Sequence, residues 1–181
     1  MIRAVQDLGQ TIARQDWLLP TLARAVFAAV LLGYFWSSGL TKLGDGPFSP
    51  SVGAYAQIFP KAMEAAGFDV SQMGLWRRLV VLVGTWAEFL LPALIVAGLF
   101  TRLAAVGMIG FVGMQTLTDL RGHGAELGAW FDRGADAVIA DQRALWVLLL
   151  AVLVTKGAGP VSLDRLLGRF LRSRAGLRVA A

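Results

Sequence analysis

One acidic side chain lies within the most apolar stretch of the sequence. Glu88 is the only charged residue between Leu79 and Phe100, a run long enough to cross a membrane at about 1.5 Å per helical residue. A charged side chain at the centre of a bilayer costs about 2.5–3.5 kcal/mol on insertion scales. The Glu88 carboxyl must therefore be protonated, paired with a cation, or directed at a polar cavity. Two roles fit this position: fixing helix packing, or catalysis as a proton-handling or ligand-binding carboxyl.

Four more polar side chains are placed to surround Glu88 if the apolar runs are antiparallel helices. Ser38 and Lys42 end one run, Gln115 lies towards the end of another, and Arg143 opens a fourth. These positions fall at the same end of the bundle, so we predict a polar, ligand-binding pocket that opens there. Lys42 or Arg143 would neutralise Glu88, and the sequence alone does not choose between them.

Aromatic side chains lie beside these polar positions. Trp86 comes just before Glu88, and Trp146 follows Arg143 in the fourth run. Tryptophan near a helix end usually belongs to the interfacial belt of a membrane protein, which is one interpretation of Trp146. Trp86 lies deeper, where its ring can stack on a planar ligand such as a quinone. We therefore include both tryptophans among the predicted ligand-binding residues.

The scarcity of metal-binding and redox-active side chains restricts the chemistry further. The 181 residues include no cysteine and one histidine, His123. Disulfides, thiolate metal sites, c-type haem, cysteine-bound iron–sulfur clusters and bis-histidine haem within the chain are therefore excluded. His123 lies near Asp119 and Glu126, but this spacing is not specific for a metal, and we predict no metal site. We expect no covalent cofactor, so any redox chemistry needs a diffusible cofactor such as quinone, or one carried by a partner.

The composition is that of an integral membrane protein. Hydrophobic residues make up 56% of the chain and charged residues 16%, against about 45–50% and about 25% in soluble domains. The net charge of +5 does not indicate nucleic acid as a partner, because the basic residues lie between and after the apolar runs, where membrane topology explains them. We predict an all-α fold, an integral membrane four-helix bundle that forms a single domain over residues 1–181.

Four apolar runs predict four membrane-spanning helices. The predicted spans are residues 22–43, 79–100, 102–119 and 141–157. The last is short enough to be a re-entrant segment, and the argument that it crosses rests on charge. Acidic residues outnumber basic ones between the third and fourth runs, whereas the tail is strongly basic. Because basic segments stay in the cytoplasm, we predict a multi-pass protein of a bacterial-type inner membrane with both termini cytoplasmic.

Two outer loops and one interfacial helix complete the predicted topology. The loops cover about residues 44–74, where a short helix is expected, and 120–140. In the basic cytoplasmic tail, residues 160–181, leucine and phenylalanine recur at helical spacing opposite arginines. This pattern predicts a C-terminal amphipathic helix at the membrane interface, which orients the protein or docks a cytoplasmic partner. Small residues in the third run indicate close helix packing, and a homodimer through them is compatible with the composition.

Several segments, taken together, resemble the DoxX family of small membrane proteins. They are RAVFAAVLLGYFWSSGLTKL, AEFLLPALIVAGLFTRLAA and KGAGPVSLDRLL, within about residues 22–167. The family pattern falls on Arg24, Ser38, Gly39, Lys42, Glu88, Pro92, Gly98, Arg102, Ser162 and Asp164. The resemblance implies a four-helix membrane bundle. Some members of the family are described as subunits of thiosulfate-quinone oxidoreductase or as partners in membrane oxidoreductase complexes, and others accompany enzymes that modify metal-binding peptides.

Three functions from different classes fit these observations. The favoured hypothesis is a quinone-interacting subunit that works with a redox partner and uses Glu88 to relay protons. The alternative is a non-catalytic membrane anchor or assembly partner for another protein, which the cofactor-free composition and the basic tail favour. A small-solute carrier is the least favoured, because the sequence shows neither inverted repeats nor broken helices. Whether the chain is part of an enzyme stays open at this point, because the sequence supplies no electron donor.

Overall fold

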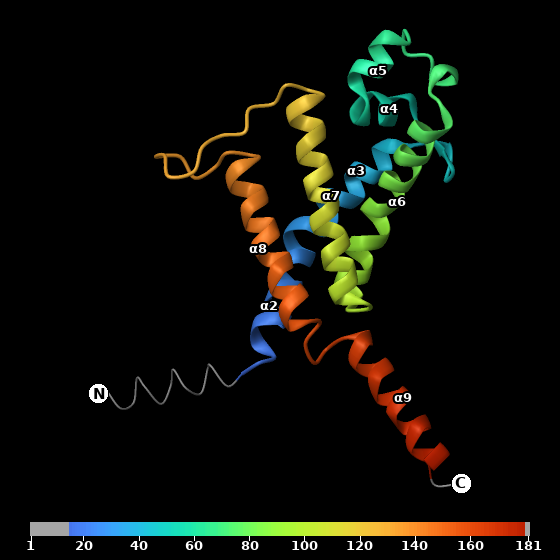
Figure 1. The fold of residues 1–181 in the computed structure, drawn as a ribbon. Helices are drawn as coiled ribbons and strands as arrows, with labels where there is room; N and C mark the ends of the chain where they lie inside the picture. Colours follow the sequence, from blue (N-terminus) through green and yellow to red (C-terminus); the bar gives the residue numbers. More distant parts are fainter. Residues whose placement is uncertain (1–14, 180–181) are drawn as a thin grey trace.

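The structure of the protein, a computed structural model, describes the backbone of residues 15–179 and the side chains of residues 15–171. It is mostly helical, with 71% helix and 4% strand. The elements are α2 (Leu18–Phe27), the π-helix η1 (Ala28–Leu32), α3 (Gly33–Lys42), β1 (Leu43–Gly46), β2 (Ser49–Pro50), α4 (Val52–Ile58), α5 (Pro60–Ala65), the 3-10 helix η2 (Val70–Gln72), α6 (Leu75–Ala97), α7 (Thr101–Arg121), α8 (Ala140–Lys156) and α9 (Leu163–Val179). Figure 1 shows α4 and α5 at one end of the long helices, here called the capped end, and α9 at the opposite end, called the α9 end.

The first long helix is built from α2, η1 and α3 without a break. It extends from Leu18 to Lys42, which is 25 residues, or about 37 Å at 1.5 Å per residue. Phe27, Leu31 and Phe35 recur every four residues and are buried. This stripe is the core-facing side of the helix, which packs against α6 and α8.

α6 and α7 are a pair of antiparallel helices joined by a tight turn at the α9 end (Figure 1). They contain 23 and 21 residues, and like the first helix they are long and apolar enough to cross a membrane. α8, with 17 residues, packs along α7 and α2. Three of the four predicted spans are therefore long apolar helices, while the crossing by α8 stays a prediction.

The predicted boundaries lie within three residues of these helices except at two starts. The first helix begins at Leu18 and not at residue 22. The span predicted over residues 79–100 begins earlier, at Leu75. Arg77 and Arg78 follow in its first turn, and charged side chains at the end of a spanning helix can reach the polar interface without interrupting the helix. The apolar run thus leaves out the first turn of α6.

The connection between the first helix and α6 is folded, whereas the sequence predicted a loop with one short helix. β1 and β2 pair as an antiparallel hairpin, in which Leu43 lies opposite Pro50. The all-α prediction agrees with the mostly helical structure but did not include this short hairpin. A Cβ atom on Gly44 would lie 2.6 Å from the Ser49 carbonyl oxygen, so the close approach of the two strands depends on this glycine.

The rest of this connection forms a cap on α6. Ser51 is the N-cap of α4, because its Oγ accepts a hydrogen bond from the Ala54 backbone N–H at 3.2 Å. Tyr55 and Met63 of the cap are buried together with Val81 of α6 in a small apolar core of their own. This second core fixes the cap to the side of α6 that carries Val81.

The connection between α7 and α8, residues 122–139, contains neither helix nor strand. It extends sideways from the capped end (Figure 1). Its end is held by the Trp130 indole N–H, which donates to the Ala140 carbonyl oxygen at 2.9 Å. This segment corresponds to the second predicted loop, residues 120–140.

Arg24 joins three segments at the α9 end. Its guanidinium group donates to the carbonyl oxygens of Ile95 and Val96 in α6, and to those of Ala158 and Val161 before α9. The last carbonyl groups of a helix have no N–H partner within the helix. Arg24 therefore donates hydrogen bonds both to the end of α6 and to the segment before α9, and so it connects the two.

Asp164 makes the corresponding contact with the start of α7. Its two carboxylate oxygens accept from the backbone N–H groups of Phe100 and Thr101 at 2.7 and 3.0 Å, which have no partner within the helix. Its own N–H donates to the Gly98 carbonyl oxygen at 2.8 Å. We call Arg24, Gly98 and Asp164 the α9 clasp, because together they attach the first turn of α9 to the α6–α7 turn.

Beyond the clasp, α9 extends away from the other helices (Figure 1). Its exposed apolar side chains are Leu163, Leu166, Leu167, Phe170 and Leu171. Arg172 contributes to the predicted amphipathic pattern, and Arg174 and Arg178 to the predicted basic charge of the tail; their side chains lie outside the described residues. The helix of the predicted tail is thus present, and its place at a membrane interface stays a prediction.

Replacing Gly98 with alanine tests the α9 clasp. Gly98 has φ of 68°, and a Cβ atom there would lie 2.6 Å from Cβ of Ser162. A left-handed conformation costs a non-glycine residue about 1–2 kcal/mol, to which the clash adds. We expect Gly98→Ala to lower the melting temperature in detergent. Gly113→Ala is the matched control, because a Cβ atom at Gly113 meets no atom within 4 Å; equal melting temperatures of the two variants would contradict the role of the clasp.

Candidate functional site

Helix α6 directs Glu88 into the interior of the protein. The buried residues of this helix follow one another at spacings of three or four, and are Val81, Thr85, Glu88, Pro92 and Ile95. They form one face of the helix, and the Glu88 side chain on that face is only 6% exposed. Pro92 lies one turn after Glu88 and has no N–H, so it cannot donate to the Glu88 backbone carbonyl group as an ordinary helical residue would.

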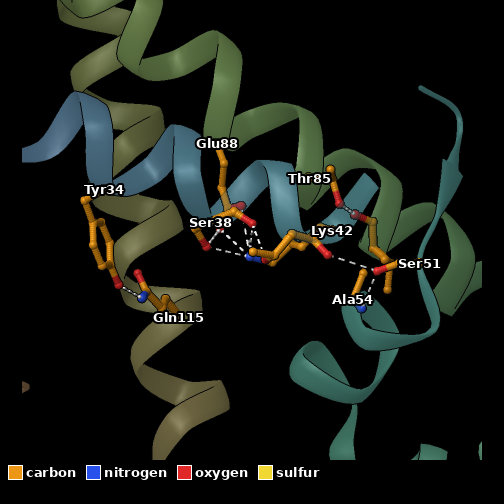
Figure 2. A network of polar contacts seen from close by, with 10 residues as sticks. Tyr34, Ser38, Lys42, Ser51, Ala54, Thr85, Glu88 and Gln115 are labelled. Carbon is orange, nitrogen blue, oxygen red and sulfur yellow. Dashed lines mark hydrogen bonds and ion pairs between the residues drawn. The ribbon is translucent and has the colours of Figure 1, made fainter. Parts of the chain in front are cut away.

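The Glu88 carboxylate is paired with the Lys42 ammonium group (Figure 2). Nζ of Lys42 lies 3.0 Å from both Oε1 and Oε2 of Glu88. Ser38 donates to Glu88 Oε1 at 3.1 Å and accepts from Lys42 Nζ at 2.7 Å. We call these three residues the polar triad. Of the two cations that the sequence offered as partners of Glu88, the structure thus places Lys42 in contact with it.

The position of Lys42 depends on close packing of α3 against α6. A Cβ atom on Gly39 would lie 2.7 Å from the Phe89 ring, so glycine allows this approach. Ser51 of the cap holds the last turn of α3, because its N–H donates to the Lys42 carbonyl oxygen at 2.9 Å and its hydroxyl donates to the Thr41 carbonyl oxygen at 3.1 Å (Figure 2). The cap and α6 therefore fix Lys42 from two sides.

Arg143 is buried in a different ion pair. One end of its guanidinium group contacts the Asp119 carboxylate of α7, and Nη1 donates to Thr116 Oγ1 at 2.9 Å. Its Nε atom is buried without a hydrogen-bond partner among the described residues. Arg143 therefore joins the start of α8 to α7, and in this structure it contributes neither to the neutralisation of Glu88 nor to the cavity beside the triad.

A cavity of about 420 Å³ lies between α6 and α7, beside the polar triad. All three residues of the triad line it, together with Gln115 of α7. Much of its remaining wall is apolar, and Val83, Leu91, Gly110 and Met114 belong to that part. A volume of about 300–1,000 Å³ and a mainly apolar wall with few polar groups are typical of small-molecule sites. We refer to it as the α6–α7 cavity.

Gln115 adds an amide group to this cavity, beside the polar triad. Its Nε2 donates to the Tyr34 hydroxyl group at 3.0 Å, which fixes the side chain (Figure 2). Its Oε1 atom is buried and has no hydrogen-bond partner among the described residues. An unpaired buried amide oxygen is costly, and a ligand that donates a hydrogen bond would remove that cost.

The two predicted tryptophans lie outside the α6–α7 cavity. Trp86 packs on Phe48 and Phe89, with ring centroids 5.9 and 6.0 Å apart, and its indole N–H donates to the Pro47 carbonyl oxygen. Trp146 packs on Tyr34 and Phe35 and lines an apolar groove of about 790 Å³ between α2 and α8. The structure therefore brings Ser38, Lys42, Gln115 and Glu88 to one cavity, but not Trp86, Arg143 or Trp146.

Two glycines of α7 line the cavity, although the sequence suggested only a packing role for small residues in this run. That role fits Gly107, because a Cβ atom there would lie 3.1 Å from Leu91. A Cβ atom on Gly110 would meet no atom within 4 Å. The sequence contains no signal that separates the two, because both are glycines on one face of an apolar helix.

Removing one member of the ion pair should cost more than removing both. Lys42→Met leaves the Glu88 carboxylate buried and unpaired, and breaking a buried pair in this way costs about 3–5 kcal/mol. In the double variant Lys42→Met/Glu88→Leu no charge remains, so we expect it to recover most of the lost stability. Melting temperatures of the unmodified protein, of Lys42→Met, of Glu88→Leu and of the double variant measure the energetic coupling between the two side chains. If the stability losses of the two single variants simply add up in the double variant, the prediction is contradicted.

Comparison with known proteins identifies the family. The model of the family described as DoxX matches residues 19–120. This segment contains nearly all of the first helix, the cap, α6 and α7, and therefore the polar triad and Gln115. No curated protein and no solved structure matches the chain. The three long apolar helices agree with the match in indicating a multi-pass membrane protein. The chain therefore belongs to the DoxX family of small membrane proteins.

Proposed function

We propose that this protein binds a quinone in the α6–α7 cavity and works with a redox partner protein. The observation that carries the proposal is a neutral polar triad at the wall of a mainly apolar cavity between helices of membrane-spanning length. A quinone has polar carbonyl groups on a planar ring and an apolar chain. The carbonyl oxygens of the quinone accept hydrogen bonds, and Lys42 is a donor for them in this cavity. The hydroxyl groups of the quinol donate hydrogen bonds, and Glu88 and the unpaired Gln115 Oε1 are acceptors for them.

In this proposal Glu88 handles the protons of the reaction. Reduction of a quinone to a quinol takes up two electrons and two protons. The electrons come from the partner, because a chain with no cysteine and one histidine holds none of the thiolate or bis-histidine redox centres. In the ion pair Glu88 is a carboxylate, so each of the two protons must come from water. The protons reach the ring through Lys42, Ser38 and Glu88, which hydrogen bonds link to one another.

We further propose that α8 is a fourth crossing and that the long helices form a four-helix bundle in a bacterial-type inner membrane. The 17 residues of α8 extend about 25 Å, and α8 packs against two of the other long helices. Four crossings place both termini on one side, and the start of α2 and the start of α9 do lie at the same end (Figure 1). The basic tail favours the cytoplasm for that side, with α9 along the interface.

Glu88→Gln tests the proton-handling role. The amide keeps the size of the side chain but carries no negative charge and takes up no proton at neutral pH. We expect quinone-dependent turnover of the complex with its partner to fall by about 10²-fold or more, while membrane insertion is retained. Glu64→Gln, at an exposed position of α5, is the matched control. Full turnover of the Glu88 variant would overturn the proposal.

The alternative function is that of a non-catalytic membrane anchor or assembly partner. The exposed leucines of α9 beyond the clasp favour it, because they offer an apolar surface to another protein. Under this alternative, truncation after Arg165 removes Leu166, Leu167, Phe170 and Leu171 and releases the partner, while Asp164 and the α9 clasp are kept. Native mass spectrometry of the protein from its own membranes measures both functions: a stable partner without quinone favours the anchor, and stoichiometric quinone favours the redox role.

A further inference from the structure

The α6–α7 cavity has two sides from which a ligand could approach. One is the capped end, where Gln57 and Ile58 of α4 contribute to its lining. The other is the lateral gap between α6 and α7, where Val83 and Gly110 line it. In a membrane protein these two sides lead to different solvents, because the capped end faces water and the lateral gap faces the acyl chains. The route therefore decides which class of molecule reaches Glu88.

The cap covers the part of the capped end where α4 lies, while Trp76, Leu79 and Asp119 line the cavity elsewhere near this end. The cap is seated on α6 through Tyr55, Met63 and Val81, which are buried together. It also touches the end of α7, because the Gln57 carbonyl oxygen accepts a hydrogen bond from His123 Nε2 at 2.7 Å. A Cβ atom on Gly122 would lie 2.9 Å from the Pro60 ring, which shows how closely the cap and α7 approach each other there. A ligand coming from water on the side of α4 would have to displace these contacts.

The lateral gap is open. Val83 of α6 is 65% exposed and Met114 of α7 is 60% exposed, although both line the cavity. Val83 comes five residues before Glu88, so it lies about 7.5 Å along the helix from the carboxyl-bearing position. The same cavity thus extends from the polar triad to side chains on the outer surface of the helix pair.

Gly110 leaves the lateral gap without a side chain at its position on α7. Glycine within a helix costs about 0.5–1 kcal/mol relative to alanine, and neighbouring Gly107 has a packing reason because Leu91 lies against it. Gly110, like Gly113, has no such neighbour, since a Cβ atom there would meet no atom within 4 Å, but of these two only Gly110 lines the cavity. The absence of a side chain at Gly110 therefore leaves room in the wall of the cavity.

We propose that the ligand enters the cavity sideways from the bilayer, through the gap bounded by Val83, Gly84, Gly110 and Met114, here called the α6–α7 window. The ligand is then an amphiphile, whose polar head reaches Lys42 and whose apolar chain stays in the window. That the head is a quinone rests on the function proposed above. The window itself rests on the exposure of its residues, on Gly110 and on the cover over part of the capped end.

A spin label tests whether the window faces lipid, without any ligand. The chain contains no cysteine, so Val83→Cys provides a single labelling site in the window, and Phe131→Cys provides one in the exposed connection between α7 and α8. In vesicles, we expect the label at Val83 to collide mainly with molecular oxygen, which concentrates in the bilayer, and the label at Phe131 with a water-soluble nickel chelate. Mainly nickel collisions at Val83 would overturn the window.

Binding of two quinones then tests the passage. One probe carries a long isoprenoid chain, and the other has the same ring with a methyl group in place of the chain. We expect the unmodified protein in nanodiscs to bind the long-chain quinone at least tenfold more tightly. Gly110→Phe fills the window and should abolish this difference, while Gly113→Phe, whose position on α7 does not line the cavity, should keep it.

The outcomes separate the two proposals. Equal affinity of the unmodified protein for both probes would overturn the window and leave the quinone site standing, and so would unchanged long-chain binding by Gly110→Phe. Failure of the unmodified protein to bind either probe would overturn the quinone as ligand. In that case the spin label still decides whether the window opens to lipid, because its signal depends on no quinone.

Discussion

The buried ion pair between Lys42 and Glu88 is the constraint on which the rest of the site depends. A carboxylate within apolar helices must be neutralised, and here the neutralising group comes from the last residue of the first helix. The two helices must therefore approach closely, which Gly39 permits, and the end of α3 must be held in place, which Ser51 of the cap provides. Ser51 thus connects the cap to the ion pair, because it holds the turn of α3 that carries Lys42.

The residues that carry the resemblance to the DoxX family gather at two places in the structure. Ser38, Gly39, Lys42 and Glu88 form or permit the polar triad, whereas Arg24, Gly98 and Asp164 form the α9 clasp. Each place contains a glycine at a close approach, and charged groups that form hydrogen bonds with other segments of the chain. The clasp fixes the α6–α7 turn, and the triad fixes α6 against the first helix. Because both act on α6, they set its position beside α7 and so the width of the cavity between them.

The sequence predicted the long helices well, because hydropathy and helical rise alone determine which runs can cross a membrane. It also predicted that Ser38, Lys42, Gln115 and Glu88 meet, since depth along antiparallel helices can be counted. Depth along a helix does not give the direction in which a side chain points, and so it could not separate Lys42 from Arg143.

For Trp86 the direction could have been worked out: residues two apart in a helix point about 200° apart, so Trp86 cannot share the inward face of Glu88. The hairpin of β1 and β2 was missed because its glycines and prolines indicate turns equally well.

The charge state of the polar triad bears on the kind of ligand that the cavity accepts. The Lys42 ammonium group has three protons, and the two Glu88 oxygens and the Ser38 hydroxyl group lie within hydrogen-bond distance of it. The triad is therefore neutral as a whole and offers no unpaired charge. An ionic solute would have to break the pair, at a cost of about 3–5 kcal/mol, before it gained a charged contact with the triad. The further charged side chain in the lining, Asp119, is itself paired with Arg143. A neutral head with hydrogen-bonding groups binds without that cost, which favours a quinone-like amphiphile over the charged substrates of a small-solute carrier.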